Sequence, residues 1–376
     1  MAATRVLVLN VGSTTVKFQV VDPASGGADV TDVVEDVGDG YDAAFGEVAR
    51  RLTDAGLSAG DLLAVGHRVV HGGSVYSAPV VLDDDAIATI EGLSDLAPLH
   101  NPPAVAGIRA ARSAYPSLPH VAVFDTAFFA DLPPAAATYA VPREVAHELG
   151  LRRYGAHGTS HAYVSRTAAA TAQRLGNDAA RQIVLHLGGG ASASAIRDGR
   201  PVETSMGLTP MEGLVMGTRS GDVDPGLVLR LLRSGRSVDE VDHLLNHDSG
   251  VLGLSGTRDF RDLEERLHAG DHDARRAFAV YVHRLRKYVG AYVAVLGGLD
   301  VLTFTAGVGE HRADLRSAVL ADLAWAGIEV DPVLNASVGD GTGPWRISPD
   351  DADCLVLVVA TNEEWEIARQ TADLVG

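Results

Sequence analysis

Apolar residues recur in short runs along this chain, and turns rich in glycine, serine and threonine separate the runs. Period-2 or continuous apolar runs predict strands at residues 5–11, 16–22, 63–70, 120–124, 181–187, 192–197, 299–306 and 354–360. Helical patterns lie between them: one over 160–175 with Ser160 as its N-cap, one from near Pro225, one over 274–296 and one from Asn362. The helix over 274–296 has an apolar stripe, which predicts a face in the core or in a subunit interface. Strands that alternate with helices indicate an α/β protein.

Two stretches of the chain share one pattern, an apolar strand, a tight turn of small residues and a second strand. They cover residues 6–22 and 183–196, with turns at Gly12-Ser13-Thr14 and Gly188-Gly189-Gly190. Such turns offer backbone N–H groups without side-chain bulk, which suits a phosphate. Two of these hairpins predict a duplicated fold that holds the phosphate tail of a nucleotide between its halves.

The length of 376 residues favours two domains, each able to bury its own core. We predict an N-terminal domain over residues 1–150, completed by a C-terminal helix at 362–376. Residues 151–361 then form a second domain.

Charge and cysteine content exclude several classes of function. Lysine and arginine number 31 against 49 aspartate and glutamate, a net charge of −18, which argues against nucleic acids and anionic membranes as partners. Cys354 is the only cysteine, so the chain can form no internal disulfide and no cysteine-based metal site. The histidines show no sequence spacing that is typical of a zinc site.

We find no signal peptide and no apolar run that could cross a bilayer, and expect a cytoplasmic location.

Two arginines stand on loops framed by glycines. Arg68 lies in the sequence GHRVVHGG, and Arg219 lies in MGTRSG. A guanidinium fork matches two carboxylate or phosphate oxygens at once. Either arginine alone could form a structural ion pair, but together they suit a transition state whose charge is spread over three oxygens.

Other candidate groups follow strands or turns. Lys17, just after the first turn, is either a solvated strand lysine or a charge for phosphates. Asp125 closes the strand at 120–124, which suits a Mg²⁺ ligand, a base or a helix cap. His157 lies in a glycine loop before a helix. The strand at 299–306 runs into the turn Gly307-Val308-Gly309, where a purine could lie against bare backbone.

The whole chain resembles the acetate kinase family, within the superfold of acetate and sugar kinases, heat-shock chaperones and actin. The matching stretches, in order, are N-x-GS-x-x-x-K at 10–17, GHRVVHGG at 66–73, APLHNPP at 97–103, FDTAF at 124–128, HGTSH at 157–161, MEGLVMGTRSGDVDP at 211–225, DFRDL at 259–263, FTAGVGE at 304–310 and ATNEE at 360–364. The resemblance implies a duplicated two-domain actin-like ATPase fold (α/β) with an interdomain active-site cleft.

The resemblance also implies an activity, the reversible phosphorylation of a short carboxylate by ATP with Mg²⁺ or Mn²⁺, in a homodimer. It implies that the domain 151–361 binds the nucleotide and forms the dimer contact. Arg68 is similar to the arginine that holds the carboxylate, Asp125 to the catalytic acid, and His157 and Arg219 to the transition-state stabilisers. Asn10 and Glu363 match the metal neighbourhood. Residues that match the acid pocket are Arg68, Val70, Leu99, Ala156 and Pro210. Residues that match the nucleotide contacts are Lys17, His186, Leu187, Gly188, Gly189, Gly190, Asp259, Phe260, Arg261, Gly307, Val308, Gly309, Glu310 and His311.

The chain departs from the family pattern at three positions. Gly189 replaces an asparagine near the phosphates, and loss of one transition-state donor can cost about 10²-fold in rate. Ala156 replaces an aromatic residue of the acid pocket, which favours propionate or a slightly larger acid as the alternative substrate to acetate. His311 replaces an asparagine near the adenosine. The alternative from another class is a nucleotide-gated binding protein of the same superfold.

Overall fold

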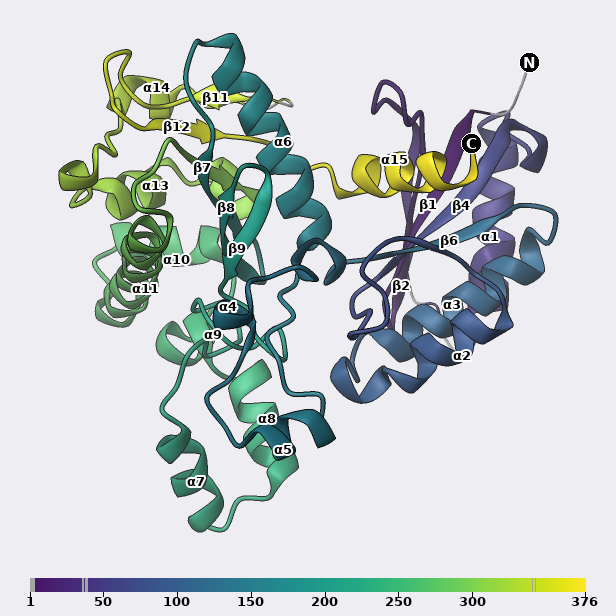
Figure 1. The fold of residues 1–376 in the computed structure, drawn as a ribbon, viewed down its shortest axis with the longest axis horizontal. Helices are drawn as coiled ribbons and strands as arrows, with labels where there is room; N and C mark the ends of the chain where they lie inside the picture. Colours follow the sequence, from purple (N-terminus) through teal and green to yellow (C-terminus); the bar gives the residue numbers. More distant parts are fainter. Residues whose placement is uncertain (1–3, 36, 38–39, 340, 342) are drawn as a thin grey trace. The chain divides into compact units, whose positions relative to one another are not determined.

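The computed structural model describes residues 4–35, 37, 40–339, 341 and 343–376. The chain forms two compact units (Figure 1). The first unit contains residues 1–131, 156–163 and 362–376, and the second contains residues 132–155 and 164–361. These units come from the structure, and the domain boundary expected near residue 150 stays a prediction.

The first unit contains a mixed sheet with the strand order β3-β2-β1-β4-β6-β5. Its strands are β1 (Arg5–Val11), β2 (Thr15–Val21), β3 (Ala28–Glu35), β4 (Leu62–Val69), β5 (Val80–Val81) and β6 (His120–Phe124). Strands β1, β4 and β6 are parallel neighbours, while β2 and β3 extend the sheet as antiparallel strands. The predicted hairpin at 6–22 is therefore β1 and β2.

The sheet of the second unit repeats this topology, with the order β9-β8-β7-β10-β12-β11. Its strands are β7 (Arg181–Leu187), β8 (Ala191–Arg197), β9 (Arg200–Thr204), β10 (Val301–Thr305), β11 (Trp345–Arg346) and β12 (Leu355–Val358). Strands β7, β10 and β12 are parallel neighbours, and β8 and β9 are antiparallel. The predicted duplicated α/β fold is confirmed.

Helices cover both faces of the first sheet, because its parallel strands are apolar on both sides. Helices α1 (Tyr41–Asp54) and α3 (Asn101–Ala114) pack on one face, where the core includes Phe18 and Val48. Helix α15 (Glu363–Val375) packs on the other face, where Ile367 joins strand residues in a second core. A Cβ at Gly66 would lie 2.6 Å from the Thr371 hydroxyl, so glycine allows this close approach. The same unit holds α2 (Asp84–Gly92).

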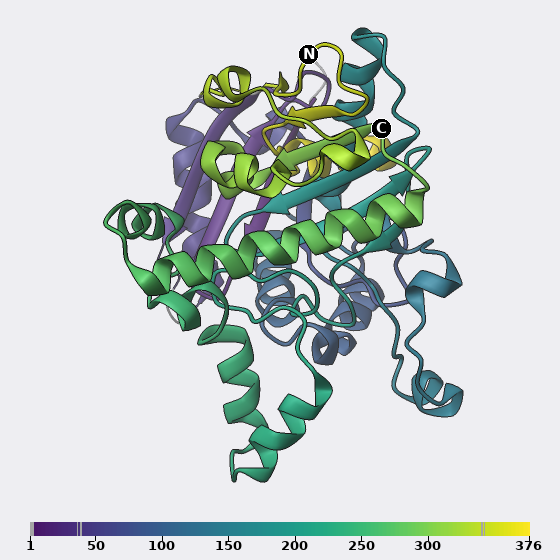
Figure 2. The same cartoon turned by 90° about the vertical axis from the view of Figure 1, so that its left-hand side faces the viewer.

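The longest helix, α11 (His272–Leu296), lies along the second sheet (Figure 2). The predicted apolar stripe is its buried face and includes Tyr281, Leu285 and Val289. The other described helices are α4 (Pro134–Ala137), α5 (Arg143–Glu148), α6 (Gly158–Arg174), α7 (Pro225–Arg233), α8 (Val238–His247), α9 (Gly250–Ser255), α10 (Phe260–His268), α12 (Ala306–His311), α13 (Ala313–Leu320) and α14 (Pro332–Ala336).

Some sequence predictions were wrong in detail. Helix α6 begins at Gly158, two residues before the predicted cap at Ser160. Strands β3 and β9 were not predicted, because most of their side chains are polar or exposed.

Among the residues that the structure describes, no helix is both long and apolar enough to span a membrane.

Candidate active site

In the first unit, the Arg68 guanidinium binds the Asp125 carboxylate. Arg68 lies near the end of β4 and Asp125 follows the neighbouring parallel strand β6, so both lie at one edge of the sheet. Arg68 Nη2 donates to Asp125 Oδ2 at 2.8 Å and Nε to the same oxygen at 3.1 Å. Asp125 is only 1% exposed, so this charge is buried together with its partner. The structure thus brings two of the predicted catalytic residues together.

Glu363, the first residue of α15, lies on the other side of the same arginine. Its Oε2 is 3.4 Å from Arg68 Nη1. Burial lowers the pKa of Arg68, but the charges of Asp125 and Glu363 outweigh burial and raise that pKa above its usual value. Arg68 therefore remains a cation. Burial raises the pKa of Glu363, and the Arg68 charge opposes this shift.

The residues near Glu363 fit a divalent cation. Glu363 Oε1 is buried and has no hydrogen-bond partner, which is costly unless another group binds it. No cluster of three His, Cys, Asp or Glu side chains that could hold a metal occurs within the described ranges. Mg²⁺ in phosphoryl-transfer sites is usually bound by one or two protein carboxylates together with phosphates and water. An oxygen of Glu363 with the Asn10 carboxamide fits that kind of donor set.

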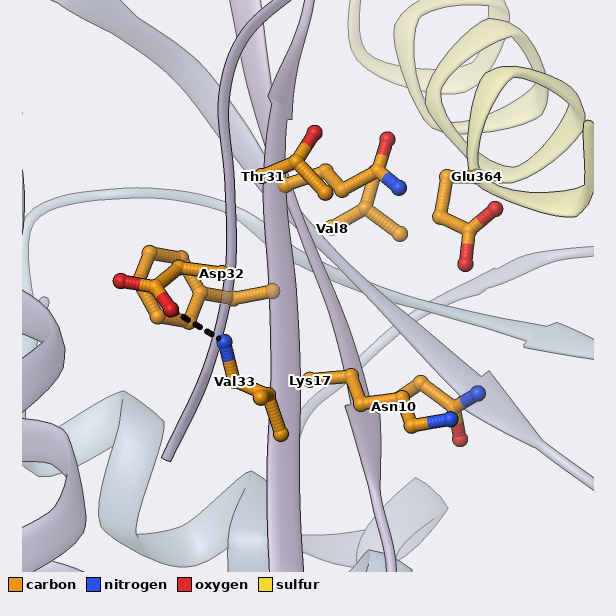
Figure 3. Close-up of a pocket in the computed structure, with 9 residues that line it drawn as sticks. Val8, Asn10, Lys17, Thr31, Asp32, Val33 and Glu364 are labelled. Atoms are coloured by element: carbon orange, nitrogen blue, oxygen red, sulfur yellow. Dashed lines mark hydrogen bonds between the residues drawn. The ribbon is translucent and has the colours of Figure 1, made fainter. Parts of the chain in front are cut away.

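Asn10 and Lys17 are paired across β1 and β2, and their side chains line one cavity (Figure 3). The cavity measures about 350 Å³ and also contacts Glu364 of α15. Burial raises the pKa of Glu364. Asp32 turns its carboxylate away from these groups in Figure 3 and forms an ion pair with Arg51. Lys17 thus lies next to Asn10 at this cavity.

The loop before α6 packs against Asp125. Gly158 N donates to Asp125 O at 2.9 Å, and a Cβ at Gly158 would overlap that carbonyl oxygen. Thr159 Oγ1 lies 3.2 Å from Asp125 Oδ1 and donates to it. Sequence analysis missed Thr159, although it lies in the HGTSH stretch. His157, next in the chain to Gly158, is thereby held near Asp125.

The predicted acid-pocket residues lie on several segments. In the first unit, Val70 follows β4 and is half-buried, Leu99 precedes α3 and is 55% exposed, and Ala156 is buried. Pro210 belongs to the second unit, where its carbonyl accepts a hydrogen bond from Arg219 at 3.3 Å.

The second unit contains a cavity of about 620 Å³ on the glycine turns. The residues that line it are Gly188, Gly189, Arg258, Asp259, Phe260, Arg261, Gly307, Val308, His311 and Arg312. Three separate predicted nucleotide loops therefore meet at one cavity. Sequence analysis missed Arg258, which directly precedes the DFRDL stretch.

Two charged residues of this cavity also have structural roles. Asp259 caps α10 by accepting from Arg261 N at 2.8 Å. The Arg261 guanidinium lowers the pKa of Asp259 to about 2. Arg312 is buried and forms an ion pair with Asp314 at 2.7 Å. These contacts hold the cavity wall in shape.

Several predicted nucleotide residues do not line the cavity. Leu187 is fully buried, His186 is 8% exposed, and Gly190 O accepts from Gly188 N at 2.9 Å to close the turn. Gly309 packs on β7 and β10. The Glu310 carboxylate accepts from Thr361 N at 3.0 Å, just before α15 begins.

Arg219 differs from the other arginines of the site. Its Nη1 contacts the Pro210 carbonyl and the Met216 sulfur, and within the described part of the chain it has no carboxylate partner. Burial lowers the pKa of Arg219. A half-buried guanidinium without a counter-charge is suited to bind an anion.

Backbone strain marks two of the site loops. His157 and Ala306 have φ values of 57° and 63°, in the left-handed region that non-glycine residues rarely adopt. Such strain is concentrated at functional sites. His157 precedes α6, and Ala306 begins α12 next to Gly307, which lines the cavity of the second unit.

A duplicated α/β fold with glycine turns around a cavity and a buried arginine–carboxylate cluster defines a phosphotransferase of the actin-like superfold. The comparisons with known proteins agree. The model of the acetokinase family matches residues 34–369. An acetate kinase from Streptomyces avermitilis is 50% identical over all of this chain and 98% of its own length.

Solved structures give the same result. An acetate kinase from Porphyromonas gingivalis is 38% identical and has a TM-score of 0.92, with both chains fully covered. A propionate kinase from Francisella tularensis is also 38% identical, with a TM-score of 0.91, over 98% of this chain and 99% of its own. This chain therefore belongs to the acetokinase family, whose members are phosphotransferases with a carboxyl group as acceptor. The predicted family and enzyme class are confirmed.

Proposed function

We propose that this chain transfers the terminal phosphoryl group of ATP to acetate and forms acetyl phosphate, reversibly and in line. The observation that carries the proposal is the Arg68 cation, which Asp125 and Glu363 hold at the sheet edge. The full-length similarity to an acetate kinase supports acetate as the acceptor.

Arg68 is the proposed carboxylate-binding group. Asp125 accepts from Nε and Nη2, so it fixes the plane of the guanidinium. Nη1, which lies 3.4 Å from Glu363 Oε2, is the guanidinium nitrogen proposed to bind the acid, and such charge-assisted bonds are strong and directional. Asp125 therefore acts as the group that orients Arg68.

No general base is needed at the start of the reaction. A short carboxylic acid has a pKa near 4 to 5 and is ionised at neutral pH. Catalysis then consists of aligning two anions and neutralising the charge that spreads over the transferring phosphoryl group. We assign that neutralisation to Arg219 and His157.

The nucleotide is proposed to bind in the second unit, in the cavity of about 620 Å³. Gly307 lines this cavity, and a Cβ there would meet no atom within 4 Å, so the backbone leaves space for a base. Lys17 is proposed as a further contact for the phosphates.

Asn10 and Glu363 would hold Mg²⁺ or Mn²⁺. When bound, the ion neutralises phosphate charge. The buried, unpartnered Glu363 Oε1 supports this assignment.

The test is to trap the acyl phosphate with hydroxylamine after incubation with Mg-ATP and acetate. Arg68→Lys keeps the charge but loses the planar fork, so we expect kcat/KM for acetate to fall by about 10²-fold. Arg109→Lys is the matched control, because Arg109 forms an exposed ion pair with Glu91 in the same unit. Absence of hydroxamate from the unaltered protein would contradict the proposal, as would equal losses in both variants.

Propionate is the second candidate acceptor, and Ala156 is the observation that favours it. Ala156 is buried and small where a larger side chain would restrict the acid pocket. We predict that Ala156→Phe raises kcat/KM for acetate relative to propionate by several-fold to about tenfold, since each buried methylene is worth about 0.8 kcal/mol. The same trapping assay measures both acids. An unchanged ratio would remove Ala156 as the selectivity determinant, and Ala156→Ser is the small-residue control.

We propose a homodimer as the assembled state. Helix α7 buries none of its residues within the described chain, although it carries Leu227 and Leu229, which are 43% and 50% exposed. An apolar helix face of this kind is best covered by a second copy of the chain.

A further inference from the structure

The segment that carries Arg219 is a loop whose two ends are bonded to each other. Gly213 N donates to Asp222 Oδ1 at 2.8 Å, and Asp222 N donates to Gly213 O at 3.0 Å. Gly213 and Gly221 have φ values of 107° and 66°, and a Cβ at either position would overlap backbone oxygens. The loop 213–222 therefore closes tightly at its base.

Asp222 also fixes this base to α11. Tyr288 donates its hydroxyl to Asp222 Oδ2 at 2.9 Å, and Arg284 Nη1 lies 3.2 Å from the same oxygen. Arg284 further donates to Gly213 O at 3.0 Å. Burial and the Asp222 charge raise the pKa of Tyr288, so its hydroxyl stays protonated and donates. The Asp222 carboxylate thus accepts hydrogen bonds from a backbone N–H and a phenol hydroxyl, and it forms an ion pair with a guanidinium.

The tip of the loop is held by several backbone hydrogen bonds and by the Thr218 hydroxyl, which donates to Asn246 O at 2.8 Å. Met216 N donates to Arg219 O at 3.1 Å, and Gly217 N donates to Gly189 O at 3.1 Å. Ser249 N donates to Thr218 O at 3.0 Å. No carboxylate in the described part of the chain pairs with the Arg219 guanidinium, so the place of this cation depends on how the loop backbone is held.

We propose that Asp222 is a positioning residue for Arg219: its carboxylate anchors both ends of the 213–222 loop on α11 and so sets where the guanidinium lies. The inference rests on the proposed function, in which Arg219 stabilises the transferring phosphoryl group. A displacement of about 1 Å at a catalytic group costs about 10²-fold in rate. Asp222 itself touches no reacting atom in this account.

The first test is Asp222→Asn, which keeps the shape but removes the charge that binds Arg284. We expect kcat to fall roughly 10- to 100-fold, while KM for acetate and for ATP stays within about threefold. Tyr288→Phe removes one of the donors to Asp222, and we expect a smaller fall in kcat.

Asp300→Asn is the matched control. Asp300 also accepts from a backbone N–H and a guanidinium in the second unit, those of Arg181, at 2.8 Å and 3.0 Å. It lies outside the proposed catalytic and binding residues, so we expect its variant to lose thermal stability without a change in kcat. Equal falls in kcat for both variants would overturn the inference.

The second test is a double-mutant cycle with Arg219→Ala. If Asp222 acts through Arg219, Asp222→Asn causes no further loss of kcat in the Arg219→Ala background. The same fold loss in both backgrounds would overturn the inference. Hydrogen exchange of residues 216–219 gives a readout besides activity, and we expect faster exchange in Asp222→Asn than in Asp300→Asn.

Different results would contradict the proposed function and the positioning role of Asp222. An unaltered protein that forms no acyl phosphate contradicts the proposed function. An active protein whose Asp222→Asn variant keeps its kcat, or keeps slow exchange at 216–219, contradicts only the positioning role.

Discussion

Gly189 stands at the position where the sequence comparison with the family pattern expected an asparagine side chain. Gly189 lines the cavity of the second unit, and its carbonyl accepts from Gly217 N in the loop that carries Arg219. A Cβ built at this position meets no atom within 4 Å, and the backbone is outside the left-handed region. The site therefore has room for the carboxamide that this chain lacks.

We predict that Gly189→Asn raises kcat, by up to about 10²-fold, because it adds a donor near the phosphates without moving the backbone. Steady-state kinetics with acetate and Mg-ATP measures the change. Gly189→Ala is the control, since it fills the same space without a donor and should leave kcat nearly unchanged. A fall in kcat for Gly189→Asn would mean that the loop functions only with glycine.

At the scale of elements, each glycine turn depends on the strands that flank it. Strands β1 and β2, and β7 and β8, pair along their full lengths, so the turns between them are fixed at a sheet edge. Helix α15 has a similar role, because Ile367 anchors it on the first sheet while Glu363 begins it beside Arg68. The position of Glu363 therefore depends on the buried contact of Ile367, about one helical turn further along α15.

At the scale of the whole molecule, both units have the same sheet topology, but they contain different groups of candidate site residues. The first unit holds the arginine–carboxylate cluster, and the second holds the glycine-lined cavity and Arg219. The second unit also presents α7, whose leucines the described chain leaves exposed.

The proposed homodimer leads to a prediction about mass in solution. Light scattering during size-exclusion chromatography should give twice the mass of one chain. Leu229→Asp on α7 should give monomers, since it places a charge in the apolar interface. Val145→Asp is the control, because Val145 is similarly exposed but lies on α5. A monomeric unaltered protein, or a dimer that Leu229→Asp leaves intact, would contradict the proposal.

Local patterns in the sequence predicted much of the fold. The hairpins at 6–22 and 183–196, the buried stripe of α11 and the start of α7 at Pro225 were predicted, because apolar periodicity and turn residues are local signals. Strand β3 was missed, since its residues are mostly exposed and only pairing with β2 makes them a strand. The predicted roles of the site residues stay predictions.

The amino-acid sequence alone determined the family, the duplicated α/β fold and most of the segments that form the candidate site, because these depend on the order of residues along the chain. Only the tertiary structure decided which side chains meet. It paired Arg68 with Asp125, left Arg219 without a carboxylate partner among the described residues, bonded Glu310 to Thr361 N and anchored the 213–222 loop to α11 through Asp222. The pairs Arg68–Asp125, Glu310–Thr361 and Asp222–Tyr288 join residues far apart in the chain, and their geometry is set by packing, which no local pattern records.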